Sequence, residues 1–140
     1  MKRKKIYWKK KYEENKLENE LFSFDQEIFK KYIKADLAIT RSGASSISEL
    51  IFFGIPFIAI PLPKSKDNHQ FYNAKDYYDK KLCWIVNQSD YRKDNLKEFI
   101  LNLIKNPENY FEKKNNMHEF SYQNTWNNIN QKLLGIINEN

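Results

Sequence analysis

Residues 35–74, ADLAITRSGASSISELIFFGIPFIAIPLPKSKDNHQFYNA, contain the signals that decide the fold. Two short apolar runs, 37–40 and 56–61, include β-branched residues and are bounded by turn signals, as buried strands usually are. Between them, apolar residues recur at helical spacing over 47–51 until Gly54 ends the helix. The stretch therefore predicts a βαβ unit, followed by a polar loop and another helix.

The turn that precedes the first helix is a candidate ligand site. In such a unit the helix N-terminus points unpaired N–H groups, and the positive end of its dipole, beyond the carboxyl end of the strand, where a phosphate fits. Gly43 would let a ligand approach the backbone closely. Three serine hydroxyl groups either cap the helix or donate hydrogen bonds to phosphate oxygens. These serines are Ser42, Ser45 and Ser46. Glu49, one turn further on, suits paired sugar hydroxyls because its negative charge would repel a phosphate.

Four motifs in this stretch follow one another in order. They are Arg41-Ser42-Gly43-Ala44-Ser45-Ser46-Ile47-Ser48-Glu49, Gly54-x-Pro56, Pro61-x-Pro63, and Asn68-His69-Gln70-x-x-Asn73-Ala74. Together they resemble the C-terminal domain of the MurG family, a part of glycosyltransferase family 28, over roughly residues 20–135. The family transfers N-acetylglucosamine (GlcNAc) from UDP-GlcNAc to lipid I, which gives the peptidoglycan precursor lipid II, on a two-domain GT-B scaffold. The resemblance implies an α/β fold, with a Rossmann-like parallel sheet flanked by helices, as an incomplete C-terminal half of such a scaffold.

The resemblance also implies roles for individual residues. Glu49 would bind the ribose hydroxyls of UDP, and His69 with Gln70 would contact the GlcNAc of the donor, unless that pair only caps its helix and faces water. Arg41 either steadies the diphosphate or braces the turn, and Asn73 more often packs or caps than binds. The residues expected to bind UDP-GlcNAc are Arg41, Ser42, Gly43, Ala44, Ser45, Ser46, Glu49, His69, Gln70 and Asn73.

Features of MurG-like enzymes are also missing from this chain. The family has an N-terminal domain with a glycine-rich loop and a histidine proposed as the base, and a Gly-Gly-Ser loop opens its C-terminal domain. The three glycines here are Gly43, Gly54 and Gly135, so no second glycine-rich loop can form. We therefore expect the donor-binding part of a GlcNAc transferase that needs a partner chain or a missing N-terminal domain. A non-catalytic nucleotide-sugar-binding or scaffold module, and a gene fragment, are the alternatives.

The rest of the sequence offers no further chemistry. No residue is expected to be catalytic, and no Cys/His set has the spacing of metal ligands, so neither a metal nor a cofactor is expected. His118 has no acidic or cysteine partner nearby in the sequence and is interpreted as a surface histidine. Cys83 is the one cysteine, and its apolar neighbours indicate a core position.

The net charge of +6 is concentrated at the N-terminus. Seven basic residues precede the first acid, Glu13, and leave 17 basic and 18 acidic residues in the rest of the chain. We therefore divide the chain into a basic segment, 1–16, and one domain, 17–140, and expect no nucleic-acid binding. The segment is either a solvated tail or, through Lys2–Lys11, a peripheral contact with anionic lipid. No apolar run is long enough to span a bilayer, so we expect a cytoplasmic protein, with attachment at the inner face of the plasma membrane left open.

Further elements are expected on both sides of the central stretch. The pattern predicts a strand over 21–24, another over 82–86, and helices over 26–34, 70–80, 94–105, 107–120 and 125–138. In the helix over 70–80 the residues spaced to pack against the sheet are Phe71, Ala74, Tyr77 and Tyr78. Without the strands that precede residue 20 in the family, the sheet would expose an edge, so we expect self-association or pairing with another chain.

Overall fold

A computed structural model describes residues 2–91, 95–123, 128 and 131 of the 140-residue chain. These residues belong to two compact units, 1–31 and 32–140. No helix among them is long and apolar enough to cross a membrane.

The first unit begins with helix α1 (Lys2–Glu14), which contains most of the basic segment. Side chains of Ile6, Tyr7 and Trp8 on this helix are all exposed. The helix ends in a Schellman pattern, in which Leu17 N–H donates to Tyr12 O and Lys16 adopts a left-handed conformation with φ of 53°. The basic segment is therefore helical up to residue 14.

The strand predicted over 21–24 is absent, and this prediction was wrong. The segment is irregular, and Phe22 and Phe24 are 45% and 78% exposed. A strand needs a neighbour to pair its backbone N–H and C=O groups, and no described residue pairs with this segment. The helix predicted over 26–34 does form, but it is shorter, as α2 (Ile28–Tyr32).

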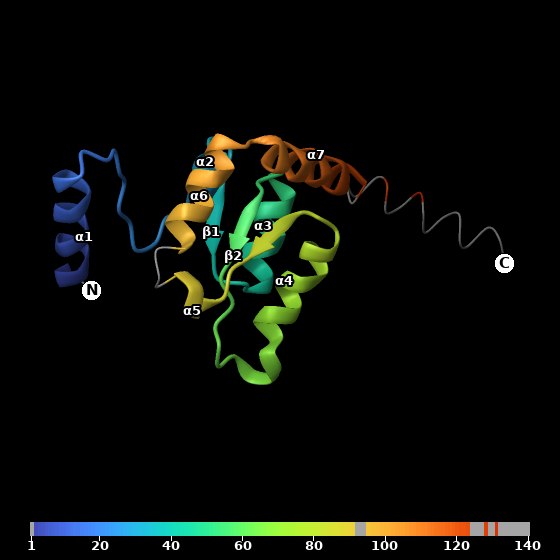
Figure 1. The fold of residues 1–140 in the computed structure, drawn as a ribbon, viewed down its shortest axis with the longest axis horizontal. Coiled ribbons are helices and arrows are strands. Elements are labelled where there is room, and N and C mark those ends of the chain that lie inside the picture. The colour runs from blue at the N-terminus through green and yellow to red at the C-terminus, as the bar shows by residue number, and fades with distance from the viewer. Residues whose placement is uncertain (1, 92–94, 124–127, 129–130, 132–140) are drawn as a thin grey trace. The chain divides into compact units, whose positions relative to one another are not determined.

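The second unit contains a parallel three-stranded sheet in the order β1-β2-β3 (Figure 1). Its strands are β1 (Ala38–Thr40), β2 (Phe57–Ala59) and β3 (Cys83–Ile85). Helix α3 (Ala44–Phe52) connects β1 to β2, and α4 (His69–Asp79) connects β2 to β3 after a 3₁₀ turn, Lys66–Asn68. The predicted βαβ unit and the α/β fold class are confirmed.

Gly54 ends α3 as expected. Its φ is +66°, a conformation that glycine adopts without the cost of a Cβ. Gly54 N–H donates to Ile51 O and Ile55 N–H to Leu50 O, which is the Schellman arrangement, and Leu50 and Ile55 are both buried. This turn directs the chain straight into β2.

Strand β2 is the centre of the core because its two faces pack into two different clusters. Phe57 and Ala59 belong to a cluster with residues of α3 and α4, whereas Ile58 packs with Trp84 and with Leu103 on helix α6 (Asn95–Lys105). Alternation along a strand produces this division, since neighbouring side chains point to opposite faces. The sheet is thus covered on both sides, as parallel sheets require.

Two further helices are described. Helix α5 (Gln88–Tyr91) follows β3, and α7 (Glu108–Gln123) follows α6 and confirms the helix predicted over 107–120. His118, on α7, is exposed as expected. The helix predicted over 125–138 falls almost wholly outside the described residues.

Cys83 occupies the core position that its neighbours indicate. Its side chain is fully buried, its Sγ lies 3.6 Å from Ala74 O, and it forms no disulfide. Burial raises the pKa of this thiol to about 12, although the charge of Lys113 acts in the opposite direction. A thiol that remains protonated at neutral pH is a poor nucleophile, so Cys83 is a structural residue.

The packing face of α4 differs from the prediction. Ala74 is fully buried and Tyr77 is half-buried against the cluster, but Phe71 and Tyr78 are 38% and 50% exposed. Two of the four residues assigned to the sheet face are therefore not part of the buried core. Phe71 instead lines a surface pocket, which lies beside the site described next.

Candidate functional site

The carboxyl ends of the three strands meet at one edge of the sheet because the strands are parallel. The chain leaves this edge through residues 41–43 after β1, 60–63 after β2 and 86–88 after β3. Ligands of open α/β sheets bind outside this edge. All ten residues expected to bind the donor lie in these exits or on the helices α3 and α4 that follow them.

The N-terminus of α3 has no side-chain cap. Gly43 is the N-cap residue, with φ of −72° and ψ of 137°, and no side chain bonds to the first N–H groups of the helix. The capping role considered for the serine hydroxyls is therefore not seen. Ser42 is fully buried, and its Oγ has no hydrogen-bond partner among the described residues. The site therefore has unpaired backbone N–H groups and an unpaired hydroxyl group at the N-terminus of α3. The helix dipole favours an anion at this end of a helix.

Arg41 braces the turn, which is one of its two expected roles. Its Nη1 donates to Ile60 O at 3.1 Å and to Pro61 O at 3.4 Å. These bonds connect the exit of β1 to the exit of β2. The guanidinium carries five donors, so the bonds leave others for a ligand.

The side chain of Asn73 is also held by a hydrogen bond within the protein. Its Nδ2 donates to Ser42 O at 3.1 Å, a bond that joins α4 to the turn before α3. Gln70 makes a similar link, because Leu62 N–H donates to its Oε1 at 3.0 Å. That bond uses one lone pair of the amide oxygen, and the NH₂ group of Gln70, a donor, remains for a ligand.

His69 begins α4, one residue before the predicted helix over 70–80, and its ring is oriented by the backbone. Its Nδ1 lies 2.7 Å from Lys66 O. A carbonyl oxygen only accepts, so Nδ1 carries the proton in this contact, and Nε2 of the neutral ring is an acceptor. Before the helix, Asp67 and Asn68 both have left-handed backbones, with φ of 51° and 53°, which Asp and Asn tolerate better than most residues.

Glu49 lies exposed on α3, and its orientation is set by a tyrosine that the sequence did not single out. Tyr32 OH donates to Glu49 Oε2 at 3.0 Å. Burial raises the pKa of Tyr32, and the hydrogen bond to Glu49 raises it further, so the phenol stays protonated and donates. The other carboxylate oxygen of Glu49 makes no bond to the described residues. Nothing in the local sequence marks Tyr32, which lies 17 positions away.

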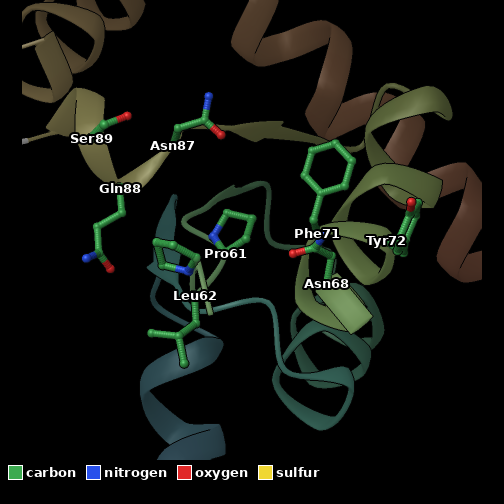
Figure 2. A pocket seen from close by; sticks show the side chains of 9 residues that line it. Pro61, Leu62, Asn68, Phe71, Tyr72, Asn87, Gln88 and Ser89 are labelled. Carbon is green, nitrogen blue, oxygen red and sulfur yellow. The ribbon is translucent and has the colours of Figure 1, made fainter. Parts of the chain in front are cut away.

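A pocket of about 490 Å³ lies next to these residues and was not predicted. It is bounded by the exits of β2 and β3 and by the first turn of α4 (Figure 2). None of the ten predicted residues lines it, although it includes Asn68 beside His69. The polar run Asn87-Gln88-Ser89 could have drawn attention to it, because it follows the carboxyl end of a predicted strand.

Among the described residues, no group of three or more His, Cys, Asp or Glu could hold a metal ion. The α3 N-terminus offers unpaired N–H groups of the kind that bind phosphate, and Glu49 and His69 offer acceptor atoms of the kind that bind hydroxyl groups.

Comparison with known proteins places these observations in a family. The model of the glycosyltransferase family 28 C-terminal domain matches residues 2–129. A protein of Pelagibacter ubique named UDP-N-acetylglucosamine--N-acetylmuramyl-(pentapeptide) pyrophosphoryl-undecaprenol N-acetylglucosamine transferase is 47% identical over 133 residues, which are 95% of this chain and 37% of the relative. A protein of the same name from Rickettsia felis is 52% identical over 77 residues, 55% of this chain and 21% of that protein.

A solved structure agrees with the sequence relatives. The crystal structure of MurG from Acinetobacter baumannii superposes with a TM-score of 0.62 and 26% identity, over 89% of this chain and 34% of that one. The matches thus cover between 21% and 37% of the length of these relatives. With the family model covering most of its length, this chain belongs to the glycosyltransferase family 28 C-terminal domain family, in its MurG-like form.

Proposed function

We propose that this domain binds UDP-GlcNAc and serves as the donor half of a hexosyltransferase. The transferase would move GlcNAc to a sugar linked to a lipid diphosphate, as in the conversion of lipid I to lipid II. The observation that carries the proposal is the uncapped N-terminus of α3 with the buried, unpartnered Ser42 Oγ beside it. A buried hydroxyl without a partner costs about 1–3 kcal/mol, and a phosphate oxygen would provide the missing acceptor.

Gly43 supports the same placement of the diphosphate. Its φ of −72° is available to any residue, and a Cβ built there would meet nothing closer than Ser46 Oγ at 4.0 Å. The fold therefore does not require glycine at this position. What the glycine provides is open space above the helix N-terminus, which a phosphate needs in order to reach the backbone N–H groups.

Glu49 fits the ribose role. One carboxylate oxygen is held by Tyr32, so the side chain is oriented before a ligand arrives, and the other oxygen can accept from a sugar hydroxyl. A carboxylate accepts strong, charge-assisted hydrogen bonds from hydroxyl groups. A pre-oriented acceptor also loses less side-chain entropy on binding.

His69 and Gln70 complement the groups of a GlcNAc ring. With its Nδ1 bonded to Lys66 O, His69 offers Nε2 as an acceptor, and Gln70 offers its NH₂ as a donor. A hydroxyl could donate to the first, and an acetamido oxygen could accept from the second. We propose these two residues as the part of the site that selects GlcNAc.

Calorimetric titration of the purified chain with UDP-GlcNAc tests the proposal. We expect binding that is stronger than for UDP-glucose and that falls about tenfold or more in Glu49→Ala, the scale for losing a charged hydrogen-bonding group. Glu119→Ala, an exposed glutamate on α7, is the matched control and should bind as the wild type does. Absence of binding in a folded sample would instead favour a scaffold module without nucleotide-sugar affinity.

We further propose that the exposed edge of the sheet receives another part of the transferase or a second copy of the chain. Strand β1 has no neighbour on its outer side among the described residues, and Ile39 is half exposed there. An apolar groove of about 340 Å³ adjoins it, lined by Leu37, which directly precedes β1, and by Leu103 and Phe111 among others. Unpaired strand edges next to apolar surface are places where chains associate. Sedimentation velocity over a range of concentrations measures self-association, and a monomer throughout would rule out the second copy.

The N-terminal unit supports a proposal about membranes. We propose that α1 binds anionic lipid, because basic residues near such a surface contribute about 1 kcal/mol each and Trp8 is exposed for an interfacial contact. Cosedimentation with neutral vesicles and with vesicles containing anionic lipid should show binding to the latter only. Reversing the charge of Lys9, Lys10 and Lys11 should abolish it, whereas reversing Lys64, Lys66 and Lys97 should not. An equal loss of lipid binding in both variants would mean that the net positive charge of the protein, and not α1, attracts the lipid.

A further inference from the structure

The pocket between the exits of β2 and β3 is separate from the proposed donor site. Its walls come from residues 61–63, from the first turn of α4 and from residues 87–89. On α4 it uses Phe71 and Tyr72, whereas the donor site uses His69, Gln70 and Asn73, none of which lines the pocket. Figure 2 shows Asn87 and Gln88 on one side of the pocket, Asn68 and Phe71 on the other, and Pro61 between them.

Residues 61–63, which follow β2 and form one wall of the pocket, are held in place by hydrogen bonds with residues of the donor site. Arg41 donates to Pro61 O, and Leu62 N–H donates to Gln70 Oε1. Both bonds involve backbone atoms, so they fix the course of the chain along the pocket. A wall that is already ordered need not lose conformational freedom when a ligand enters.

The chemistry of the lining points to one class of ligand. It contains no charged side chain, which argues against a phosphate or a carboxylate as the main recognition group. Amides and hydroxyls supply hydrogen bonds, and they belong to Asn68, Tyr72, Asn87, Gln88 and Ser89. Pro61, Leu62, Pro63 and Phe71 supply apolar contact. A pyranose ring has the matching character, because its hydroxyls need many neutral hydrogen-bond partners while its C–H faces pack on aromatic and proline rings.

Gln88 gives the pocket an unsatisfied polar group. Its Oε1 is buried and has no hydrogen-bond partner in the described part of the chain. Buried side-chain oxygens in folded proteins are nearly always paired. A ligand hydroxyl that enters the pocket, together with a small rotation of the amide, would supply the missing donor.

We propose that this pocket is a second saccharide subsite, which takes an uncharged pyranose such as an N-acetylhexosamine. The sugar binds there independently of the nucleotide at the α3 N-terminus. If the proposed function holds, this sugar is part of the acceptor of the glycosyl transfer. The proposal that a sugar binds to the pocket does not depend on that function.

Nuclear magnetic resonance titration of the full chain with methyl β-N-acetylglucosaminide and with its β-1,4-linked disaccharide tests the subsite. We expect saturable shifts of the amide signals of Leu62 and of residues 87–89, both without nucleotide and with saturating UDP. Gln88→Leu, which keeps the size of the side chain but removes its amide, should weaken sugar binding about fivefold or more. Phe71→Ala should weaken it as well, and Phe52→Ala, which removes an exposed aromatic side chain on α3, should not.

Two outcomes would overturn the subsite. Absence of saturable shifts at these residues up to the solubility of the sugars would show that the pocket does not bind them. Displacement of the sugar by UDP would show that the pocket is part of the nucleotide site. UDP titration of the same samples keeps the two proposals apart, because Gln88→Leu should bind UDP as the wild type does even if sugar binding is lost.

Discussion

Replacing Phe57 by alanine should lower the free energy of unfolding by about 3–5 kcal/mol, the largest loss of stability that we expect. Phe57 is fully buried on β2, the central strand, where it packs in the cluster that joins α3 and α4 to the sheet. Truncation removes the ring and leaves a cavity that the strand cannot close, because Ile58 anchors β2 on the opposite face. Single domains are stable by only about 5–15 kcal/mol, so the variant should lose a large fraction of the stability of the domain.

Urea denaturation followed by circular dichroism measures this effect. Phe52→Ala is the matched control, since Phe52 lies on α3 in the same region but is 75% exposed, and it should cost less than about 1 kcal/mol. Similar losses in the two variants would contradict the central position of β2 in the core.

Replacing Ala44 by aspartate should produce opposite effects on stability and on ligand binding. Ala44 is the first residue of α3 and is exposed. A carboxylate there interacts favourably with the helix dipole, so the variant should be more stable by about 0.3–1 kcal/mol. The same charge repels a diphosphate, by roughly 4 kcal/mol at a separation of about 4 Å before screening, so the affinity for UDP should fall about a hundredfold.

Thermal unfolding and calorimetric titration of the same samples measure the two effects. Ala44→Asn removes the charge while keeping the shape, and it should bind UDP far better than Ala44→Asp does. Unchanged affinity in Ala44→Asp would place the diphosphate away from the helix N-terminus. Loss of both stability and binding would mean that the substitution damages the turn itself.

The parts of the fold that could be predicted from the sequence are those that local pattern determines. The apolar runs before Arg41 and before Pro61 became β1 and β2, and Gly54 marked the end of α3, because burial and backbone conformation act over a few residues. The segment 21–24 has a similar apolar run but no strand. Whether such a run pairs depends on a distant neighbour, which local pattern does not reveal.

The candidate site was predictable in its location but not in its hydrogen bonds. Parallel strands bring their exits together, which is why the positions from Arg41 to Asn73 converge. The partners of these side chains come from far along the chain, as in the bond from Arg41 to Ile60 O and that from Tyr32 to Glu49. Phe71 shows the same limit, since its spacing fits a buried face and yet it lines a surface pocket.

Three side chains that shape the site form hydrogen bonds with main-chain atoms of a strand exit. Arg41 bonds to the carbonyls of residues 60 and 61, Gln70 to the N–H of residue 62, and Asn73 to the carbonyl of residue 42. Main-chain groups are nearly the same whatever side chain they carry, so these bonds place little constraint on which residues occupy those positions. During evolution, positions such as 42 and 62 could therefore change to suit a different sugar or nucleotide while the loops kept their shape.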